Sequence, residues 1–332
     1  MPFEAAARKL FARSLNREFA GSFHRPMEIY LPIAQMSVHW IVILGMGLAV
    51  GFLSGMFGIG GGFLLTPLLI FYGIPPGVAV ATTASQVTAS TFSGMISHWR
   101  QKTVDLKMGG VMLAGGLAGT AFGVYLFGIL RRVGQAELTV SASYVILLGA
   151  VGGLMLNESV RTLRAVRAGQ PAGGRKPGQH NWVHGLPFKM RFRRSRLYIS
   201  VIPPALLGFT VGILSAIMGV GGGFIMVPVM IYVLRVPTNV TVGTSLFQVL
   251  FVTAASTVLH AVDNYTVDIM LALLLILGGV VGVQFGVRMA ARLRGEQLRM
   301  LLALLALAMA LRLLYDLVAT PPDLYSLAVS AT

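Results

Sequence analysis

One glycine-rich motif occurs twice in this chain, and each copy lies inside a long apolar stretch. Residues 58–63 read GIGGGF, and residues 219–224 read GVGGGF. Each copy is followed four residues later by a proline, Pro67 in the first and Pro228 in the second. Because each glycine costs a helix roughly 1 kcal/mol relative to alanine, a continuous helix is disfavoured at both places. The motif therefore predicts two matched breaks in otherwise helical segments.

The similarity between the two copies extends well beyond this motif. Residues 51–123 match residues 208–286, and the matched positions include a polar cluster, a histidine and a second set of glycines. Duplicated membrane units that each contain a broken helix are typical of carriers, which bind their substrate where the two repeats meet. We therefore expect two pseudosymmetric halves with a binding site between them.

The composition places these repeats in a membrane. Hydrophobic residues make up 55% of the 332 residues and charged residues only 11%. Residues 29–99 and 197–234 contain no Asp, Glu, Lys or Arg, and both stretches exceed the roughly 20 residues that a helix needs to cross a bilayer. The sequence predicts an all-α polytopic membrane protein in the plasma membrane, which in a bacterium is the inner membrane.

The hydropathy pattern divides the chain into two repeats with flanking polar segments. In each repeat we expect four to five hydrophobic helical segments, one of which is a short, broken or re-entrant helix that starts at the glycines. The predicted parts are an amphipathic N-terminal segment, transmembrane repeat 1, a basic cytoplasmic linker, transmembrane repeat 2 and a C-terminal tail, at residues 1–37, 38–157, 158–197, 198–318 and 319–332. A cytoplasmic location for both the N-terminal segment and the linker follows from their basic residues. The loop charges leave open whether the repeats are parallel or inverted.

The net charge of +15 does not indicate nucleic-acid binding. The predicted linker alone holds ten of the 26 basic residues, and basic loops beside membrane spans orient the protein and attract anionic lipid. The absence of cysteine excludes disulfides and thiolate zinc sites. The glycine runs match neither the dinucleotide fingerprint, which fails at Phe63, nor a phosphate-binding loop, which ends in Lys followed by Ser or Thr. We expect no cofactor, no metal and no nucleic-acid partner.

Several segments together resemble the sulfite exporter TauE/SafE family, also called the 4-toluene sulfonate uptake permease family. The segments that carry the resemblance read GFLSG, GIGGGFLLTP, GIPP, ATTASQ, SHWR and GVGGGFIMVP, at residues 51–55, 58–67, 73–76, 81–86, 97–100 and 219–228. The resemblance covers about residues 28–318 and implies transport of small sulfur-containing or organic anions, such as sulfite, sulfonates or sulfoacetate. It also implies coupling to an ion gradient of protons or sodium. It does not identify the anion, the direction of transport or the oligomeric state.

The glycine runs are the first candidate substrate site. An interrupted helix frees backbone N–H groups, and a half-helix that restarts there presents its positive dipole end, so an oxyanion could bind without Lys or Arg. The other interpretation is that the glycines only allow close helix packing. The predicted binding glycines are Gly60, Gly61, Gly62, Gly221, Gly222 and Gly223.

Polar side chains in the next segment of each repeat are the second candidate. Buried hydroxyls and carboxamides need hydrogen-bond partners, and each glutamine lies four residues after a threonine on the same helix face. We expect these side chains to complete a neutral cage around an oxyanion. The alternative is helix-to-helix hydrogen bonding, worth about 0.6 kcal/mol per bond. The residues are Thr82, Thr83, Gln86, Thr244, Ser245 and Gln248.

A matched pair of histidines, His98 and His260, ends these two segments. Histidine titrates near neutral pH, so the pair is a candidate for proton coupling, with a structural role as the alternative. We predict a secondary transporter of small anions that works by alternating access, with an anion channel or passive pore as the alternative. An enzyme ranks last, because the sequence shows no metal-ligand cluster and no buried carboxylate pair.

Overall fold

The computed structural model describes residues 28–57, 60–167, 189–192, 194–195, 197–234, 236–290 and 295–319. Within these described residues, each half has one β-hairpin followed by five helices. The first half contains β1 (Glu28–Leu31), β2 (Met36–His39), α2 (Trp40–Phe57), α3 (Gly62–Phe71), α4 (Pro76–Arg100), α5 (Leu106–Arg132) and α6 (Ala136–Arg167). The second half contains β3 (Lys189–Phe192), β4 (Leu197–Ser200), α7 (Ile202–Met218), α8 (Gly223–Tyr232), α9 (Thr238–Leu259) with the π-helical turn η2 (His260–Asn264), α10 (Ile269–Ala290) and α11 (Gly295–Val318).

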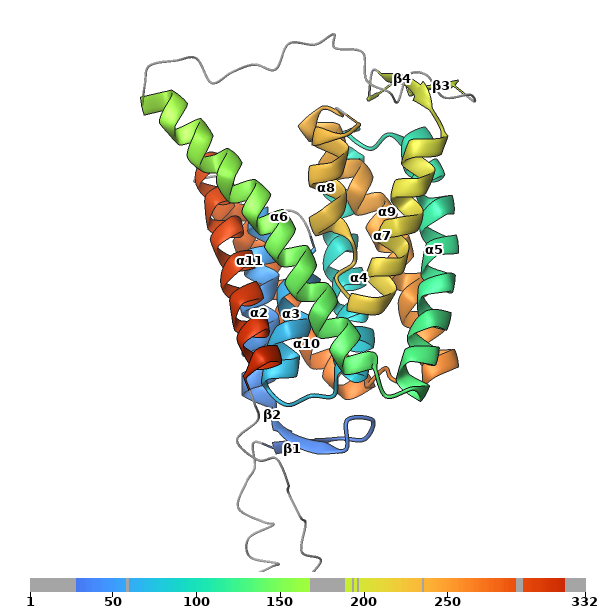
Figure 1. Cartoon of the computed structure of the whole chain (residues 1–332), viewed down its shortest axis with the longest axis vertical. Coiled ribbons are helices and arrows are strands. Elements are labelled where there is room, and N and C mark those ends of the chain that lie inside the picture. The colour runs from blue at the N-terminus through green and yellow to red at the C-terminus, as the bar shows by residue number, and fades with distance from the viewer. Residues whose placement is uncertain are drawn as a thin grey trace, which may run out of the picture.

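The helices confirm an all-α polytopic membrane protein. In the described ranges, six helices are long and apolar enough to cross a bilayer, namely α2, α5, α6, α9 (counted with its π-helical turn), α10 and α11. Helix α4 is also long, at 25 residues, but it carries a series of Thr, Ser and Gln residues that lowers its hydropathy. In Figure 1, α4 lies in the interior of the molecule among the other helices, where these polar groups are shielded from lipid.

The two repeats have inverted topology. The hairpin β1–β2 lies at the lower end of Figure 1, whereas β3–β4 lies at the upper end. Each hairpin leads directly into the first helix of its half, so α2 and α7 begin at opposite ends of the molecule. This arrangement settles the question that loop charges leave open. It also corrects the expectation that the N-terminal segment and the linker both lie on the cytoplasmic side, because each contains one of these hairpins.

Helices of one half pack on helices of the other half through glycines. A Cβ atom on Gly51 of α2 would lie 2.3 Å from the carbonyl oxygen of Gly279 in α10. In the same way, a Cβ atom on Gly212 of α7 would lie 2.3 Å from the carbonyl oxygen of Gly116 in α5. Such close backbone contact requires small residues at one-turn spacing, which is common between membrane helices. The halves are therefore interlocked through the pairs α2–α10 and α5–α7.

Each hairpin is tied to a buried aspartate of the other half. The Asp105 carboxylate caps α5 by accepting from the Lys107 and Met108 amides, and it also accepts from the Ser195 amide at 2.9 Å. The Asp268 carboxylate caps α10 and accepts from the Ile33 amide at 3.0 Å. These contacts place each hairpin at the start of a helix from the opposite repeat.

Two predicted boundaries differ from the structure. Helix α6 continues to Arg167, well past the predicted end of repeat 1 at residue 157. Its last turns are helical although their sequence is polar, so the loss of hydropathy did not mark the end of the helix. The two hairpins occupy residues that we assigned to the N-terminal segment and to the linker. Residues 1–27, most of the predicted amphipathic N-terminal segment, lie outside the described residues.

Candidate functional site

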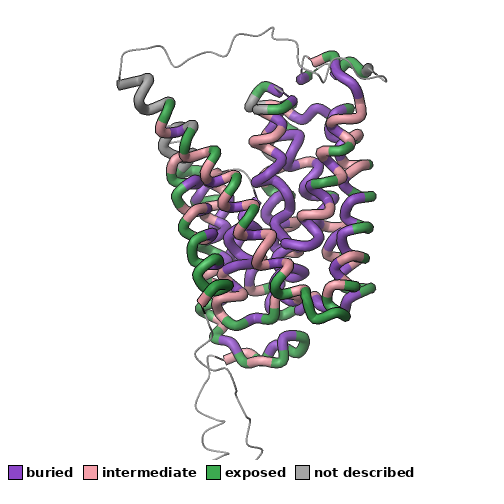
Figure 2. Tube along the Cα trace, viewed as in Figure 1, coloured by how far each residue is buried: buried purple, intermediate pink, exposed green. Residues whose placement is uncertain are grey.

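The two glycine breaks are buried in the interior of the molecule. Helix α3 begins at Gly62 with Gly61 as its N-cap, and α8 begins at Gly223 with Gly222 as its N-cap. Residues 61–67 and 216–226 are all buried, and purple segments fill this region in Figure 2. The prediction of short helices that start at the glycines is therefore confirmed.

The breaks of the two repeats contact each other. A Cβ atom on Gly62 would lie 2.7 Å from the carbonyl oxygen of Gly219 and 2.8 Å from that of Val220. One residue further along each short helix, the rings of Phe63 and Phe224 stack with their centroids 4.7 Å apart. Both rings are fully buried. The N-terminal ends of two half-helices, one from each repeat, thus meet at the centre.

Backbone donors at the start of α8 lack acceptors. Among the described residues, no carbonyl or side chain accepts from the amides of residues 221–224. Buried N–H groups without an acceptor are rare in folded proteins and cost about 1–3 kcal/mol each. The same end of the helix carries roughly half a positive charge from the helix dipole. Such an arrangement suits an anionic ligand.

The other end of the same break is capped by protein groups. The Met218 carbonyl, the last of α7, accepts from the Tyr144 hydroxyl at 2.7 Å. The Ala216 carbonyl is paired with His260 Nε2 at 2.9 Å, and the Ser215 carbonyl accepts from the Gly219 amide at 2.8 Å. These donors offset the negative end of the α7 dipole.

Two buried glutamine side chains also lack hydrogen-bond partners. Gln86 of α4 and Gln248 of α9 are fully buried, and neither the oxygen nor the nitrogen of either amide has a hydrogen-bond partner among the described residues. Their chain neighbours, Val87 and Val249, both pack against Gly221 of the second break. The glutamines occupy matched positions in the two repeats, as the sequence analysis predicted. The amide nitrogens themselves lie against the opposite repeat, Gln86 Nε2 2.4 Å from the point where a Cβ atom on Gly279 of α10 would be and Gln248 Nε2 2.6 Å from that on Gly116 of α5. Four buried polar atoms are thus left unsatisfied beside these glycine contacts, where each is costly without a partner.

Small hydroxyls add to this cluster. The hydroxyl of Thr83 is buried and unpaired among the described residues. Thr91 has an unpaired hydroxyl as well, and its oxygen lies 3.7 Å from the point where a Cβ atom on Gly60 would be. Thr91 follows Val87 by one helical turn, so it faces the first break. Sequence reasoning missed Thr91, although its spacing from Val87 placed it on this face.

Three other predicted site residues have structural partners. The Thr82 hydroxyl oxygen accepts from the Asp268 amide at 3.3 Å, and that of Thr244 accepts from the Asp105 amide at 3.0 Å. Ser245 donates to the Val242 carbonyl within its own helix. Thr82 and Thr244 therefore hold the starts of helices α10 and α5 from the opposite repeat. Their place in the cage stays a prediction, because each hydroxyl still has a proton to donate.

The two histidines do not form a pair. His98 lies half-buried in the last turn of α4, with Nδ1 3.0 Å from the Thr103 hydroxyl oxygen. His260 is fully buried just after α9, where Nδ1 pairs with the Asn264 side-chain nitrogen at 3.1 Å. His98 and His260 each lie at the C-terminal end of their helix, and α4 and α9 belong to repeats of inverted topology. His260 nevertheless approaches the second break through its bond to α7.

Tyr144 is the central residue that the sequence analysis missed. It is fully buried on α6, and besides bonding Met218 its hydroxyl lies 3.5 Å from the Gly62 carbonyl oxygen. A buried tyrosine needs a partner for its hydroxyl, so a tyrosine inside an apolar span was a usable signal. Tyr144 connects the breaks of both repeats.

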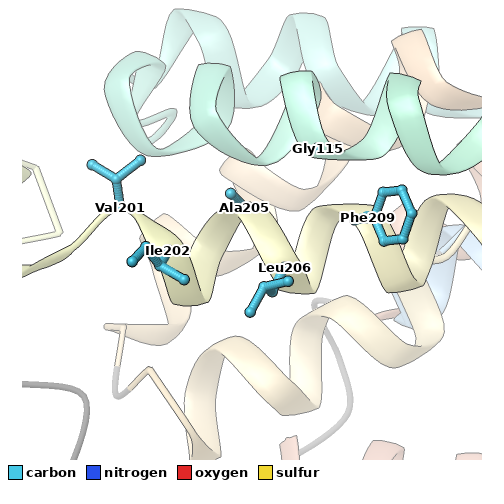
Figure 3. Close-up of a pocket in the computed structure, with 6 residues that line it drawn as sticks. All are labelled: Gly115, Val201, Ile202, Ala205, Leu206 and Phe209. Carbon is cyan, nitrogen blue, oxygen red and sulfur yellow. The ribbon is translucent and has the colours of Figure 1, made fainter. Parts of the chain in front are cut away.

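A separate pocket of about 410 Å³ lies between α5 and α7. Its lining is apolar, as Figure 3 shows, and consists of Gly115, Val201, Ile202, Ala205, Leu206 and Phe209. None of these side chains can donate a hydrogen bond to an anion. The central cluster, rather than this pocket, has the chemistry of an anion site.

Comparison with known proteins places the chain in a family. The family model described as sulfite exporter TauE/SafE matches residues 43–313, which include both breaks and both glutamines. The chain belongs to the sulfite exporter TauE/SafE family. The resemblance inferred from the motifs is confirmed.

Several relatives agree with this assignment. A probable membrane transporter protein of Bacillus subtilis, YjnA, is 29% identical over 82% of this chain and 99% of its own length. A probable membrane transporter protein of Xylella fastidiosa is 28% identical over 83% of this chain and 95% of its own. The Arabidopsis thaliana sulfite exporter TauE/SafE family protein 6 is 51% identical over 15% of this chain and 12% of its own. No solved structure matches this chain.

The family and the helices together define the general class of the protein. It is an integral, multi-pass membrane transporter of the TauE/SafE type, and not an enzyme. In the described part of the chain, no group of three or more His, Asp or Glu residues could hold a metal ion.

Proposed function

We propose that this protein is a secondary transporter of small anions, of the sulfur oxyanion or organosulfonate type, which binds them between the two central breaks. The observation that carries the proposal is the group of buried N–H donors at residues 221–224, which have no acceptor among the described residues. The unpaired amides of Gln86 and Gln248 would supply further donors. Sulfite and sulfonate present several oxygen acceptors around one sulfur, so they can accept from several donors at once.

The second glycine run forms the better-supported part of the site. Gly221, Gly222 and Gly223 would let the anion approach the backbone closely, since a side chain at any of them would fill that space. Gly60, Gly61 and Gly62 would contribute the matching surface from the first repeat, together with Thr83. The description of the family as sulfite exporters supports a sulfur oxyanion as substrate.

Alternating access fits an inverted-repeat fold. The pairs α2–α10 and α5–α7 have backbone-to-backbone contacts that resist sliding, so we assign them to the rigid frame. The short helices α3 and α8 meet only tip to tip, through Phe63 and Phe224, and we assign the movement to them. The buried stack of Phe63 on Phe224 would obstruct a continuous conduit through the centre, which supports a carrier over the anion channel or passive pore.

A coupling ion would be a proton or sodium. His260 remains our candidate for proton coupling, because its Nε2 atom bonds the α7 carbonyl of Ala216 close to the second break. His98, near the opposite end, would be the matched group for the other half of the transport cycle.

Uptake by purified protein in liposomes tests the proposal. Labelled methanesulfonate and sulfite should enter in a saturable manner under an imposed proton or sodium gradient, and Gln86→Leu and Gln248→Leu should each lower uptake at least tenfold, by about 1.4 kcal/mol or more. Gln284→Leu is the matched control, because Gln284 is exposed on α10 and should transport normally. Normal uptake by both buried-glutamine variants, or unsaturable flux, would contradict the proposed carrier site.

A further inference from the structure

The apolar pocket between α5 and α7 lies beside a helix contact that both repeats share. A Cβ atom on Gly115 would meet the Ala205 carbonyl oxygen, and a Cβ atom on Gly278 of α10 would meet that of Leu44 in α2. Ala205 lines the pocket of Figure 3, whereas the matched residue, Leu44, is larger by an isopropyl group. The small side chain of Ala205 therefore leaves room beside α5 that a leucine would fill.

The residues around this pocket face the hydrocarbon of the membrane. Helix α5 is long and apolar enough to cross a bilayer. Leu206, in the pocket lining, is 59% exposed, and Ala114 and Leu117 of α5 are exposed as well. Exposed apolar side chains on membrane helices contact lipid tails, which pack on them by dispersion. An apolar pocket of about 410 Å³ at this surface suits a lipid acyl chain.

Basic side chains lie at the end of the pocket where α5 begins. Lys107 is exposed in the first turn of α5, eight residues before Gly115, and this spacing corresponds to about 12 Å along the helix. Lys102 is exposed in the connection that precedes α5. In the described part of the chain, neither lysine forms an ion pair with an acidic side chain. Both ammonium groups are thus available to a ligand outside the protein.

The hairpin β3–β4 adds a third basic group at the same end. The Arg194 guanidinium donates to the Lys102 and Val104 carbonyls, both at 2.8 Å, so the hairpin is held against the start of α5. Arg191 of β3 lies directly opposite Tyr198 of β4, and both side chains are exposed. Strand β4 leads into α7 and the pocket, so this pair lies close to the pocket end. Tyrosine and arginine side by side are typical of a membrane–water interface.

The matched end of the other repeat lacks these basic residues. Lys107 corresponds to Met270, which lies eight residues before Gly278. In the same alignment, Lys102 corresponds to Tyr265, and the fold is kept because both residues have a positive φ, 57° and 51°. The connection therefore folds in the same way without lysine. Basic residues at one end help to orient a membrane protein, but orientation does not require a pocket beside them.

We infer that the pocket between α5 and α7 binds one acyl chain of an anionic phospholipid. Its phosphate would lie among Lys102, Lys107 and Arg191, with Tyr198 at the level of the headgroups. The inference is carried by an apolar pocket and a group of unpaired cations that occur together in one repeat. It concerns lipid binding and does not depend on the proposed anion transport.

Native mass spectrometry of the full-length protein in detergent tests the headgroup. Titrated phosphatidylglycerol should bind saturably, and phosphatidylcholine should bind at least roughly fivefold more weakly, because its choline cancels the phosphate charge. Lys107→Met, which introduces the residue of the matched position, should weaken phosphatidylglycerol binding roughly fivefold and leave phosphatidylcholine unchanged. Arg132→Met is the control, because Arg132 is exposed at the other end of the same helix.

A second variant tests the acyl chain. Ala205→Leu should fill the pocket and weaken the binding of both lipids at least roughly tenfold. Ala118→Leu adds the same bulk to the exposed face of α5 outside the pocket lining and should bind lipid as wild type does. If Ala205→Leu does not fold, the two lipids and Lys107→Met decide the question.

Three results would overturn the inference. Wild-type protein could bind the two lipids equally, or Lys107→Met could keep the full preference for phosphatidylglycerol. A folded Ala205→Leu variant that binds phosphatidylglycerol as tightly as wild type would show that no acyl chain occupies the pocket. A failure of anion transport would leave the inference standing, because lipid binding is measured without transport.

Discussion

The two glycine breaks share a sequence but differ in backbone conformation. The N-cap of α3, Gly61, has a φ of −66°, whereas the N-cap of α8, Gly222, has a φ of 75° in the left-handed region. A Cβ atom on Gly222 would lie 2.1 Å from a Val211 methyl, and one on Gly61 would lie 2.6 Å from a Val50 methyl. A repeated motif therefore fixes where the helix breaks, while the surroundings decide how the chain passes through the break.

The surroundings differ because only one repeat supplies a central tyrosine. Tyr144 of α6 reaches the centre, whereas Tyr315, the tyrosine in α11, is 65% exposed. The residue before the proline is Thr66 in α3 and Val227 in α8, so the buried hydroxyl at this position also exists only in the first of the two short helices. The two sides of the molecule are thus related by pseudosymmetry but are chemically unequal. For a transporter this difference would give the two orientations of the site unequal energies.

The largest expected difference between the breaks concerns the N-cap glycines. Gly222→Ala should lower the free energy of unfolding by about 3 kcal/mol, because alanine meets both an unfavourable φ and the Val211 side chain. Gly61→Ala should cost about 1–2 kcal/mol, because φ is favourable for alanine and only the contacts with Val50 and Ser54 must relax. Thermal unfolding of the purified variants in detergent measures both. Equal losses would show that the conformational difference between the breaks has no energetic consequence.

A smaller effect on stability is expected at Tyr144, whose buried hydroxyl distinguishes the first repeat from the second. Tyr144→Phe keeps the ring but leaves the Met218 carbonyl without its donor, which should cost about 1–3 kcal/mol of stability. Transport should also change, since the negative end of α7 would then face the anion uncapped. Tyr315→Phe, at an exposed position, is the control and should behave as wild type. An unchanged melting temperature and uptake rate for Tyr144→Phe would show that the hydroxyl contributes neither to stability nor to transport.

The smallest effects should be equal in the two repeats. Thr82→Val and Thr244→Val each remove one hydroxyl that accepts a helix-start amide of the other half, at a cost of about 1 kcal/mol. Thr210→Val, whose hydroxyl is exposed and bonds its own helix, should change stability by less. The anion affinity of the folded variants should stay at the wild-type level. A selective loss of anion affinity in Thr82→Val or Thr244→Val would show that these side chains bind the anion.

Much of the fold followed from local signals in the sequence. Glycine runs and hydropathy located the breaks and the long helices, since both act over a few residues. The hairpins were missed, because four-residue strands such as Glu28–Leu31 lack a distinctive pattern within a long apolar stretch. The inverted topology was not predictable, because basic residues flank both the first repeat and the linker and so indicate no single orientation.

The site residues that occur at matched positions in both repeats could be predicted from the sequence. Gln86 and Gln248 stood out because a costly buried amide occurs at the same place twice. Thr82 and Thr244 are repeated as well, but their partners, Asp268 and Asp105, become visible only when opposite repeats come together. Tyr144 occurs once, so a search for matched positions passed over it. Repetition thus reveals shared roles but conceals the residues that make the halves unequal.

The central claim is that backbone amides at the breaks bind the anion, and nuclear magnetic resonance tests it most directly. Protein labelled with ¹⁵N-glycine in lipid nanodiscs would be titrated with methanesulfonate. The amide resonances of Gly221, Gly222 and Gly223 should shift saturably, while those of Gly149 and Gly153, whose surroundings are open, should not move. Saturable methanesulfonate binding that leaves all three central glycine amides unshifted would contradict the claim.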